Sequence, residues 1–123
     1  MTLIDTSAWI EALRSDGRHE VRSQVAGLLE TGQAVLCPMV TLELWNGAGG
    51  DAERAKLRRL TENLPSYEIT HAAWARAVEL ATTARSKGVT VPATDIVIAA
   101  TAAVHNLGLL HSDRHFDALH GLK

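Results

Sequence analysis

The stretch Leu3-Ile4-Asp5-Thr6-Ser7 opens the chain with a short apolar run that ends in a carboxylate and two hydroxyls. An apolar run of this length, followed at once by polar residues, predicts a buried strand with Asp5 at its C-terminal tip. In open α/β sheets, ligands bind outside the carboxyl ends of the strands. We therefore interpret Asp5 as the floor of an acidic, metal-binding site.

The composition is that of an ordinary globular protein. At 123 residues, with 46% hydrophobic and 21% charged residues, we expect one domain, 1–123, with a single core. The only cysteine, Cys37, lies in an apolar run, which predicts a buried thiol and a reducing, cytoplasmic environment. We expect no signal peptide and no membrane span, because the basic leader and the long apolar run are both missing. With a net charge of −2, any RNA contact needs a local basic patch.

Apolar periodicity divides the chain into helices that alternate with short strands. Strands are expected at the opening stretch and over residues 34–37, 67–69 and 109–111, and helices over 6–13, 20–31, 38–46, 51–63, 71–87 and 95–105. Hydroxyl residues are placed to cap three of these helices, at Thr6 or Ser7, at Thr70 and at Thr94. The alternation predicts an α/β fold, in which helices cover both faces of a mainly parallel sheet.

Four acids fall where such a topology would bring them together: Asp5, Glu43, Asp95 and Asp113. Each alone has a simpler interpretation, since an aspartate near a helix start favours the helix dipole and a helical glutamate usually faces solvent. Glu43, however, lies between two leucines, and Asp95 precedes an almost wholly apolar helix, so a compensating charge is needed. Oxygen ligands without cysteine partners favour Mg²⁺ or Mn²⁺ over zinc, and phosphodiester hydrolysis is a chemistry that calls for such a site.

These acids lie within four ordered motifs that together resemble a PIN domain, specifically a VapC-type toxin ribonuclease. The motifs are Leu3-Ile4-Asp5-Thr6-Ser7, Thr41-Leu42-Glu43-Leu44, residues 92–100 and residues 110–116. The resemblance covers essentially the whole chain. It implies a three-layer α/β/α PIN-like fold with a central sheet of four to five strands, and an Mg²⁺- or Mn²⁺-dependent endoribonuclease that acts on single-stranded or looped RNA.

The resemblance also implies roles for the individual side chains. Asp5, Asp95 and Asp113 would be metal ligands, and Glu43 would position or activate the hydrolytic water. Three neighbouring hydroxyls would orient the carboxylates, although simple capping explains them equally well: Thr6, Ser7 and Ser112.

A basic side on the predicted helix 51–63 is the clearest route to an RNA backbone in this acidic protein. A solvated helix face explains it equally well. With one arginine from the closing segment, the candidates are Arg54, Arg58, Arg59 and Arg114. Trp9, Trp45 and Trp74 all occupy apolar helical positions, which favours core packing over base stacking for each of them.

The resemblance further implies a homodimer and a VapB-like antitoxin whose tail covers the acidic cleft. A structured RNA such as tRNA is the expected substrate. Two alternatives stay open: a PIN-domain RNA-processing nuclease without an antitoxin, and a PIN-like binding module without catalysis. The second is disfavoured because degenerate members usually lose acids, and all four are present here.

Overall fold

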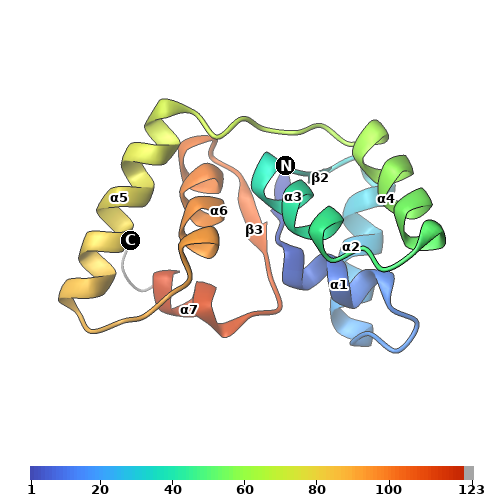
Figure 1. Ribbon diagram of the computed structural model, residues 1–123, viewed down its shortest axis with the longest axis horizontal. Coiled ribbons are helices and arrows are strands. Elements are labelled where there is room, and N and C mark those ends of the chain that lie inside the picture. The colour runs from blue at the N-terminus through green and yellow to red at the C-terminus, as the bar shows by residue number, and fades with distance from the viewer. Residues whose placement is uncertain (121–123) are drawn as a thin grey trace.

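A small parallel sheet occupies the centre of the molecule in the computed structural model, which describes residues 1–120 except for the side chains of residues 114, 115 and 120 (Figure 1). Its three strands are β1 (Thr2–Ile4), β2 (Ala34–Val35) and β3 (Gly108–Leu110). They run in the order β2-β1-β3. The apolar opening stretch therefore forms the central strand, as its sequence predicts.

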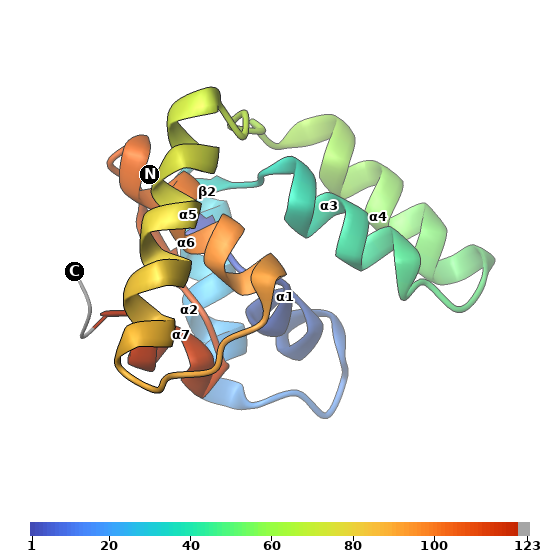
Figure 2. The same cartoon turned by 60° about the vertical axis from the view of Figure 1, so that its left-hand side comes forward.

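Seven helices surround the strands in the described part of the chain. They are α1 (Thr6–Leu13), α2 (His19–Glu30), α3 (Pro38–Asn46), α4 (Asp51–Asn63), α5 (His71–Ser86), α6 (Ala93–Val104) and α7 (Arg114–His120). In Figure 1, α5 to α7 lie to the left of β3, whereas α2 and α4 lie on the right-hand side of the molecule. Figure 2 shows α3 and α4 side by side, projecting together from the rest of the molecule. The predicted α/β class is confirmed.

The sheet has fewer strands than the four to five expected. Within the described residues, the segment predicted as a strand over 67–69 contributes only one neighbouring bridge, between Ser66 and Leu36. The carbonyl of Glu68 accepts a hydrogen bond from Nε2 of His105 at 2.8 Å, instead of from a strand neighbour. The backbone N–H of Tyr67 donates to the carbonyl of Leu36 at 2.8 Å, so the segment pairs with the residue after β2 and borders the sheet without forming a full strand.

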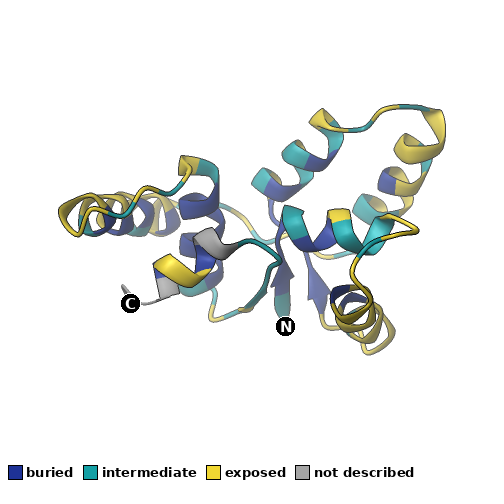
Figure 3. Ribbon diagram, turned by 90° about the horizontal axis from the view of Figure 1, so that it is seen from below, coloured by how far each residue is buried: buried dark blue, intermediate teal, exposed yellow. Residues whose placement is uncertain are grey.

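Buried residues concentrate along the strands and on the inner sides of the helices, whereas exposed residues occupy the outer turns (Figure 3). Helix α6 is buried at every position from Asp95 to Ala102, as expected for a helix that is apolar all round. Trp9 is 1% exposed and Cys37 is fully buried, so both predicted core positions are confirmed.

Trp74 is 48% exposed, so the prediction that it packs in the core is wrong. Helix α5 turns its alanine-rich side inward, with Ala73, Ala77 and Leu80 buried. Small side chains allow α5 to lie close to α6, its main neighbour. Trp74 follows Ala73 by one residue, about 100° around the helix, and therefore lies away from that contact.

The helix starts show which side chains act as caps. Asp5, not a hydroxyl residue, caps α1. Helix α6 begins at Ala93 behind Pro92, so Thr94 lies inside the helix and the prediction that it is the cap is wrong. None of the helices in the described residues is both long and apolar enough to cross a membrane.

Thr70 caps α5 as predicted, because its hydroxyl accepts a hydrogen bond from the backbone N–H of Ala73 at 3.1 Å. We expect Thr70→Ala to lower the free energy of unfolding by about 1 kcal/mol, since that N–H loses its acceptor. Thr70→Ser keeps the acceptor and serves as the control in urea denaturation. Equal stability of the two variants would contradict the capping role.

Candidate active site

Asp5 lies at the carboxyl end of β1, where the chain turns directly into α1. Its Oδ2 accepts hydrogen bonds from the backbone N–H of Ser7 at 3.0 Å and from the Ser7 hydroxyl at 2.5 Å. Its own backbone N–H donates to the carbonyl of Leu110 at 2.9 Å, which continues the pairing with β3. The Asp5 side chain is therefore held at the carboxyl end of the central strand, as predicted from the sequence.

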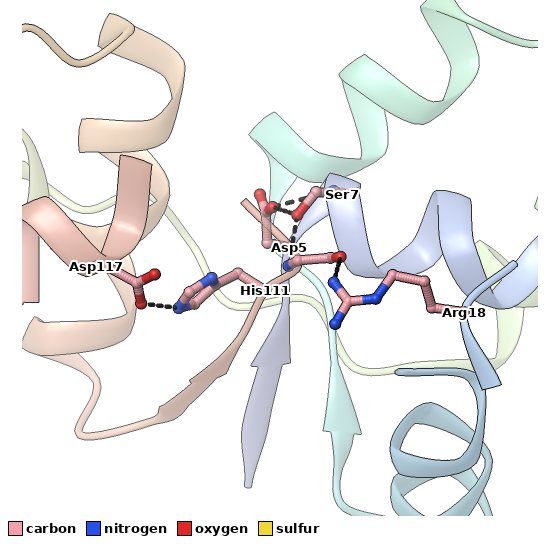
Figure 4. Close-up of polar contacts among 6 residues, drawn as sticks. Asp5, Ser7, Arg18, His111 and Asp117 are labelled. Carbon is pink, nitrogen blue, oxygen red and sulfur yellow. Dashed lines mark hydrogen bonds and ion pairs between the residues drawn. The ribbon is translucent and has the colours of Figure 1, made fainter. Parts of the chain in front are cut away.

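Ser7 links this edge to the segment that follows β3 (Figure 4). Its Oγ donates to Asp5 and also accepts the backbone N–H of Ser112 at 2.9 Å. One hydroxyl thus joins residues that lie 105 positions apart in the sequence. Ser112 contributes its backbone to this link, while its hydroxyl accepts a hydrogen bond from Nη1 of Arg18 at 3.1 Å.

Glu43 approaches from α3, which packs against α1 and α6. The hydroxyl of Thr6 donates to Oε1 of Glu43 at 2.7 Å. Since Thr6 is the residue after Asp5, this hydrogen bond brings a second carboxylate to the end of β1. Glu43 is only half-buried, so its carboxylate keeps some contact with solvent.

The Asp5 carboxyl is 2% exposed, and burial raises its pKa above the ordinary value. The hydrogen bonds from Ser7 oppose this effect, while the negative charge of Glu43 adds to it. The ion pairs found among the described residues include neither Asp5 nor Glu43. Buried carboxylates without a counter-charge are costly, which fits a site that receives a cation.

Asp113 is the residue after Ser112, whose backbone N–H donates to Ser7, and Asp95 lies on a separate helix, α6. Asp95 occupies the first turn of α6 and is 9% exposed. Asp113 follows β3 directly and is half-buried. In the described part of the chain, no group of three or more His, Cys, Asp or Glu side chains stands together as a ready-made metal site. The convergence of all four acids therefore stays a prediction.

The predicted basic residues divide between two places. Arg54, Arg58 and Arg59 are exposed on α4, and Arg54 forms an ion pair with Asp51 at 3.2 Å. The predicted Arg114 begins α7, but its side chain lies outside the described residues. Arg18, which contacts Ser112, was not predicted, because no pattern in its own neighbourhood links it to the end of β3.

The chain is similar to known proteins over nearly its whole length. Residues 2–122 match the family model described as PIN domain. The chain belongs to the PIN domain family. It is 36% identical to ribonuclease VapC11 of Mycobacterium tuberculosis over 124 aligned residues, which cover 97% of this chain and 91% of the relative.

Two solved structures share the PIN fold with this chain. A FitAcB crystal structure from Neisseria gonorrhoeae aligns with a TM-score of 0.74 and 22% identity, covering 98% of this chain and 94% of the other. VapBC2 from Rickettsia felis, bound to a DNA fragment from its promoter, aligns with a TM-score of 0.76 and 17% identity, covering 92% and 87%. At these identities the likeness concerns the fold alone.

Within this PIN domain, the sheet edge combines features that suit a hard divalent cation. The predicted ligands are all carboxylates, and Asp5 is buried beside Glu43 without a cationic partner in the described ion pairs. The hydroxyls of Thr6 and Ser7 each hold one carboxylate, so both carboxylates are oriented before any ligand arrives.

Proposed function

We propose that this PIN domain is a metal-dependent endoribonuclease that acts as the toxin of a type II toxin–antitoxin pair. One observation carries the proposal: a buried carboxylate, Asp5, is held by a hydroxyl at the carboxyl end of the central strand, beside a second carboxylate, Glu43. The 36% identity to a VapC ribonuclease over nearly the whole chain supports the same function.

We assign Asp5, Asp95 and Asp113 as the residues that would hold Mg²⁺ or Mn²⁺. A bound divalent cation would supply Lewis-acid activation of the phosphodiester and of the hydrolytic water. Glu43 would accept a proton from that water, and the hydrogen bond from Thr6 and its partial contact with solvent support this role. Ser7 keeps Asp5 in one orientation through its short hydrogen bond.

Partners follow from the same proposal. We expect a VapB-like antitoxin, a homodimer and a cytoplasmic location for this single PIN domain of residues 1–123. The related structures named VapBC support the antitoxin, since each contains a toxin with its partner. RNA is the substrate, with a structured RNA such as tRNA as the expected target.

A groove of about 310 Å³ lies beside one of the four predicted acids, Glu43, and would offer a path for the RNA. It runs between α1, α3 and α4, and Glu43 contributes to its lining together with Arg14 and Lys56. Lys56 belongs to the basic helix α4, whose Arg58 and Arg59 are exposed. The lining of the groove also includes Glu53 and several apolar side chains, while Arg58 and Arg59 lie on α4 outside it.

Neutralising Arg58 and Arg59 tests whether the exposed basic face of α4 binds RNA. We expect the double Arg→Gln variant to bind single-stranded RNA about tenfold more weakly, with a smaller dependence of affinity on salt, because up to two phosphate contacts are lost. Affinities are compared by fluorescence anisotropy at several salt concentrations. The matched control is the double Gln variant of Arg85 and Lys87, which removes two charges near the end of α5. An unchanged salt dependence would show that α4 is only a solvated face.

The hydroxyl of Ser7 gives a second prediction. We expect Ser7→Ala to slow RNA cleavage by about 10- to 100-fold, because Asp5 loses the group that orients it. The free energy of unfolding should fall by about 1–2 kcal/mol, since the Ser112 N–H loses its acceptor. Ser23→Ala, on the exposed side of α2, is the control. Cleavage by Ser7→Ala at the wild-type rate would contradict an orienting role.

The proposed function is tested by incubating the purified protein with total cellular RNA, with Mg²⁺ or Mn²⁺ and with EDTA. We expect endonucleolytic products only with metal, and growth arrest when the protein is expressed without an antitoxin. Asp5→Asn and Asp95→Asn should be inactive in both assays. Absence of cleavage by the wild type, or equal cleavage by the variants, would refute the proposal. Cleavage without growth arrest would favour an RNA-processing nuclease.

A further inference from the structure

The loop between α1 and α2 holds Arg18 in one place. At Gly17 the loop passes so close to α1 that an added side-chain carbon would stand 1.8 Å from the carbonyl oxygen of Glu11. The backbone N–H of Arg18 then donates to Oε2 of Glu11 at 2.7 Å. Any side chain at position 17 would force the loop away from α1. The close approach at Gly17 and the hydrogen bond to Glu11 therefore fix the backbone of Arg18.

The guanidinium of Arg18 extends from this loop to the segment after β3, beside the acidic site (Figure 4). Its Nη1 donates to the hydroxyl of Ser112 at 3.1 Å. The backbone N–H of Ser112 donates to Ser7, and the Ser7 hydroxyl donates to Asp5. A continuous chain of hydrogen-bonding residues thus connects an exposed cation to the buried carboxylate.

None of the ion pairs among the described residues includes Arg18. Those pairs involve Arg14, Arg54, Arg76 and His111. A guanidinium has five N–H donors, and Ser112 accepts from only one of its nitrogens. Arg18 therefore exposes several N–H donors and a positive charge to solvent. The nearby carboxylates are negatively charged and would repel a polyanion such as RNA, so a cation beside them reduces that repulsion.

We propose that Arg18 binds a phosphate of the RNA backbone next to the scissile phosphodiester, and so sets the register of the strand at the acids. This inference rests on the proposed ribonuclease function. Arginine suits the task because its donors match two phosphate oxygens at once. The hydrogen bond to Glu11 fixes the backbone of Arg18 before RNA binds. The hydrogen bond to Ser112 keeps the guanidinium close to the segment that carries Asp113.

Replacement of Arg18 with glutamine separates this role from that of a structural clamp. Arg18→Gln removes the charge but retains an amide that can donate to Ser112. The matched control is Arg22→Gln, which removes the same charge one turn further along α2, where the Arg22 Nη1 donates to the carbonyl of Ser15 at 3.1 Å. The probe is a short single-stranded RNA of mixed sequence, bound in EDTA so that cleavage does not occur, and then cleaved with Mn²⁺.

We expect Arg18→Gln to bind the RNA about five- to tenfold more weakly, with a slope of log affinity against log salt that is shallower by about 0.7. KM should rise by a similar factor while kcat stays within about twofold, because the contact is made in the ground state as well. Arg22→Gln should match the wild type in both assays. Arg18→Lys, which keeps the charge without the paired donors, should fall between the wild type and Arg18→Gln.

Three outcomes separate the inference from the function on which it rests. If the wild type cleaves RNA and Arg18→Gln binds and cleaves like Arg22→Gln, the inference is wrong and the proposed function stands. A lower melting temperature of Arg18→Gln without a change in the salt slope would likewise overturn it, in favour of a clamp on Ser112. If the wild type cleaves no RNA with metal, the proposed function fails, and the inference fails with it.

Discussion

Asp5→Asn is expected to reduce RNA cleavage by about 100- to 1000-fold while leaving the fold intact. The loss follows from removing a charged oxygen at the centre of the predicted ligand set. The fold should persist because asparagine is as good an N-cap as aspartate, so its side-chain oxygen can still accept the N–H of Ser7 at the start of α1. Cleavage is measured with Mg²⁺ and Mn²⁺, and folding by circular dichroism.

The same variant should be at least as stable as the wild type when metal is absent. Burial raises the pKa of Asp5 in the folded state, so its protonated form contributes stability at low pH, and this contribution is lost as the pH rises through the raised pKa. Asparagine carries no charge at any pH. The melting temperature of Asp5→Asn relative to the wild type should therefore increase from acidic to neutral pH in EDTA.

Added Mg²⁺ or Mn²⁺ should raise the melting temperature of the wild type and not that of Asp5→Asn, because only the wild type offers the charged ligand. Asp16→Asn serves as the control for the loss of one negative charge, because the side chain of Asp16 is 84% exposed and lies in the loop before α2. If Asp5→Asn keeps both the metal-induced shift and the cleavage rate, Asp5 is not a ligand.

Trp9→Ala is expected to lower the free energy of unfolding by about 3–5 kcal/mol. Trp9 is 1% exposed and belongs to the core cluster formed by the strands and the helices around them. Truncation to alanine removes most of the side chain and leaves a cavity that a close-packed interior fills only partly. Since small domains are stable by only about 5–15 kcal/mol, the variant should melt far below the wild type.

Trp9→Phe is the matched control, because it removes the indole nitrogen while retaining an aromatic ring. The Nε1 of Trp9 is buried and has no hydrogen-bond partner among the described residues. A buried donor without a partner costs about 1–3 kcal/mol, so its loss offsets part of the lost packing. Urea denaturation followed by circular dichroism compares the variants. Equal stability of Trp9→Ala and Trp9→Phe would contradict the assigned core role.

Local patterns predicted the helices well. Helices α3 and α4 have the bounds expected from their apolar periodicity and from the proline and glycines around them. Thr70 was correctly expected to cap α5. One failure was also local in origin: Thr94 has the right chemistry for a cap, yet the N-cap position of α6 is Pro92, two residues earlier. Residue propensities identify which residues can cap a helix, but they do not show at which of several neighbouring positions the helix begins.

Contacts between distant segments were harder to predict. Trp74 was misplaced because periodicity shows that a helix has an apolar side without showing which part of that side meets its neighbour. The strand expected over 67–69 is reduced to backbone contacts with Leu36 at its start, while the carbonyl of Glu68 accepts a hydrogen bond from His105, 37 residues away. Such choices depend on how α5 and α6 pack together, which no single segment encodes.

For the candidate site, the sequence by itself predicted the type of chemistry, a carboxylate site for a divalent metal ion. The apolar run that ends at Asp5 specified a buried strand with a carboxylate at its C-terminal end. Leu3 and Ile4 are fully buried, and the polar residues follow directly after them. The order of the four motifs specified the PIN domain family, which the comparison confirms.

Only the tertiary structure decided which groups hold that carboxylate. The pairing of β1 with β3 brings Ser112 to Ser7, and the packing of α3 on α1 brings Glu43 to Thr6. The close approach at Gly17 places Arg18 beside them. These contacts join residues 37 to 105 positions apart. Strand and helix formation responds to neighbours along the chain, whereas these hydrogen bonds require the whole core to be packed, and for that reason the local sequence patterns did not reveal them.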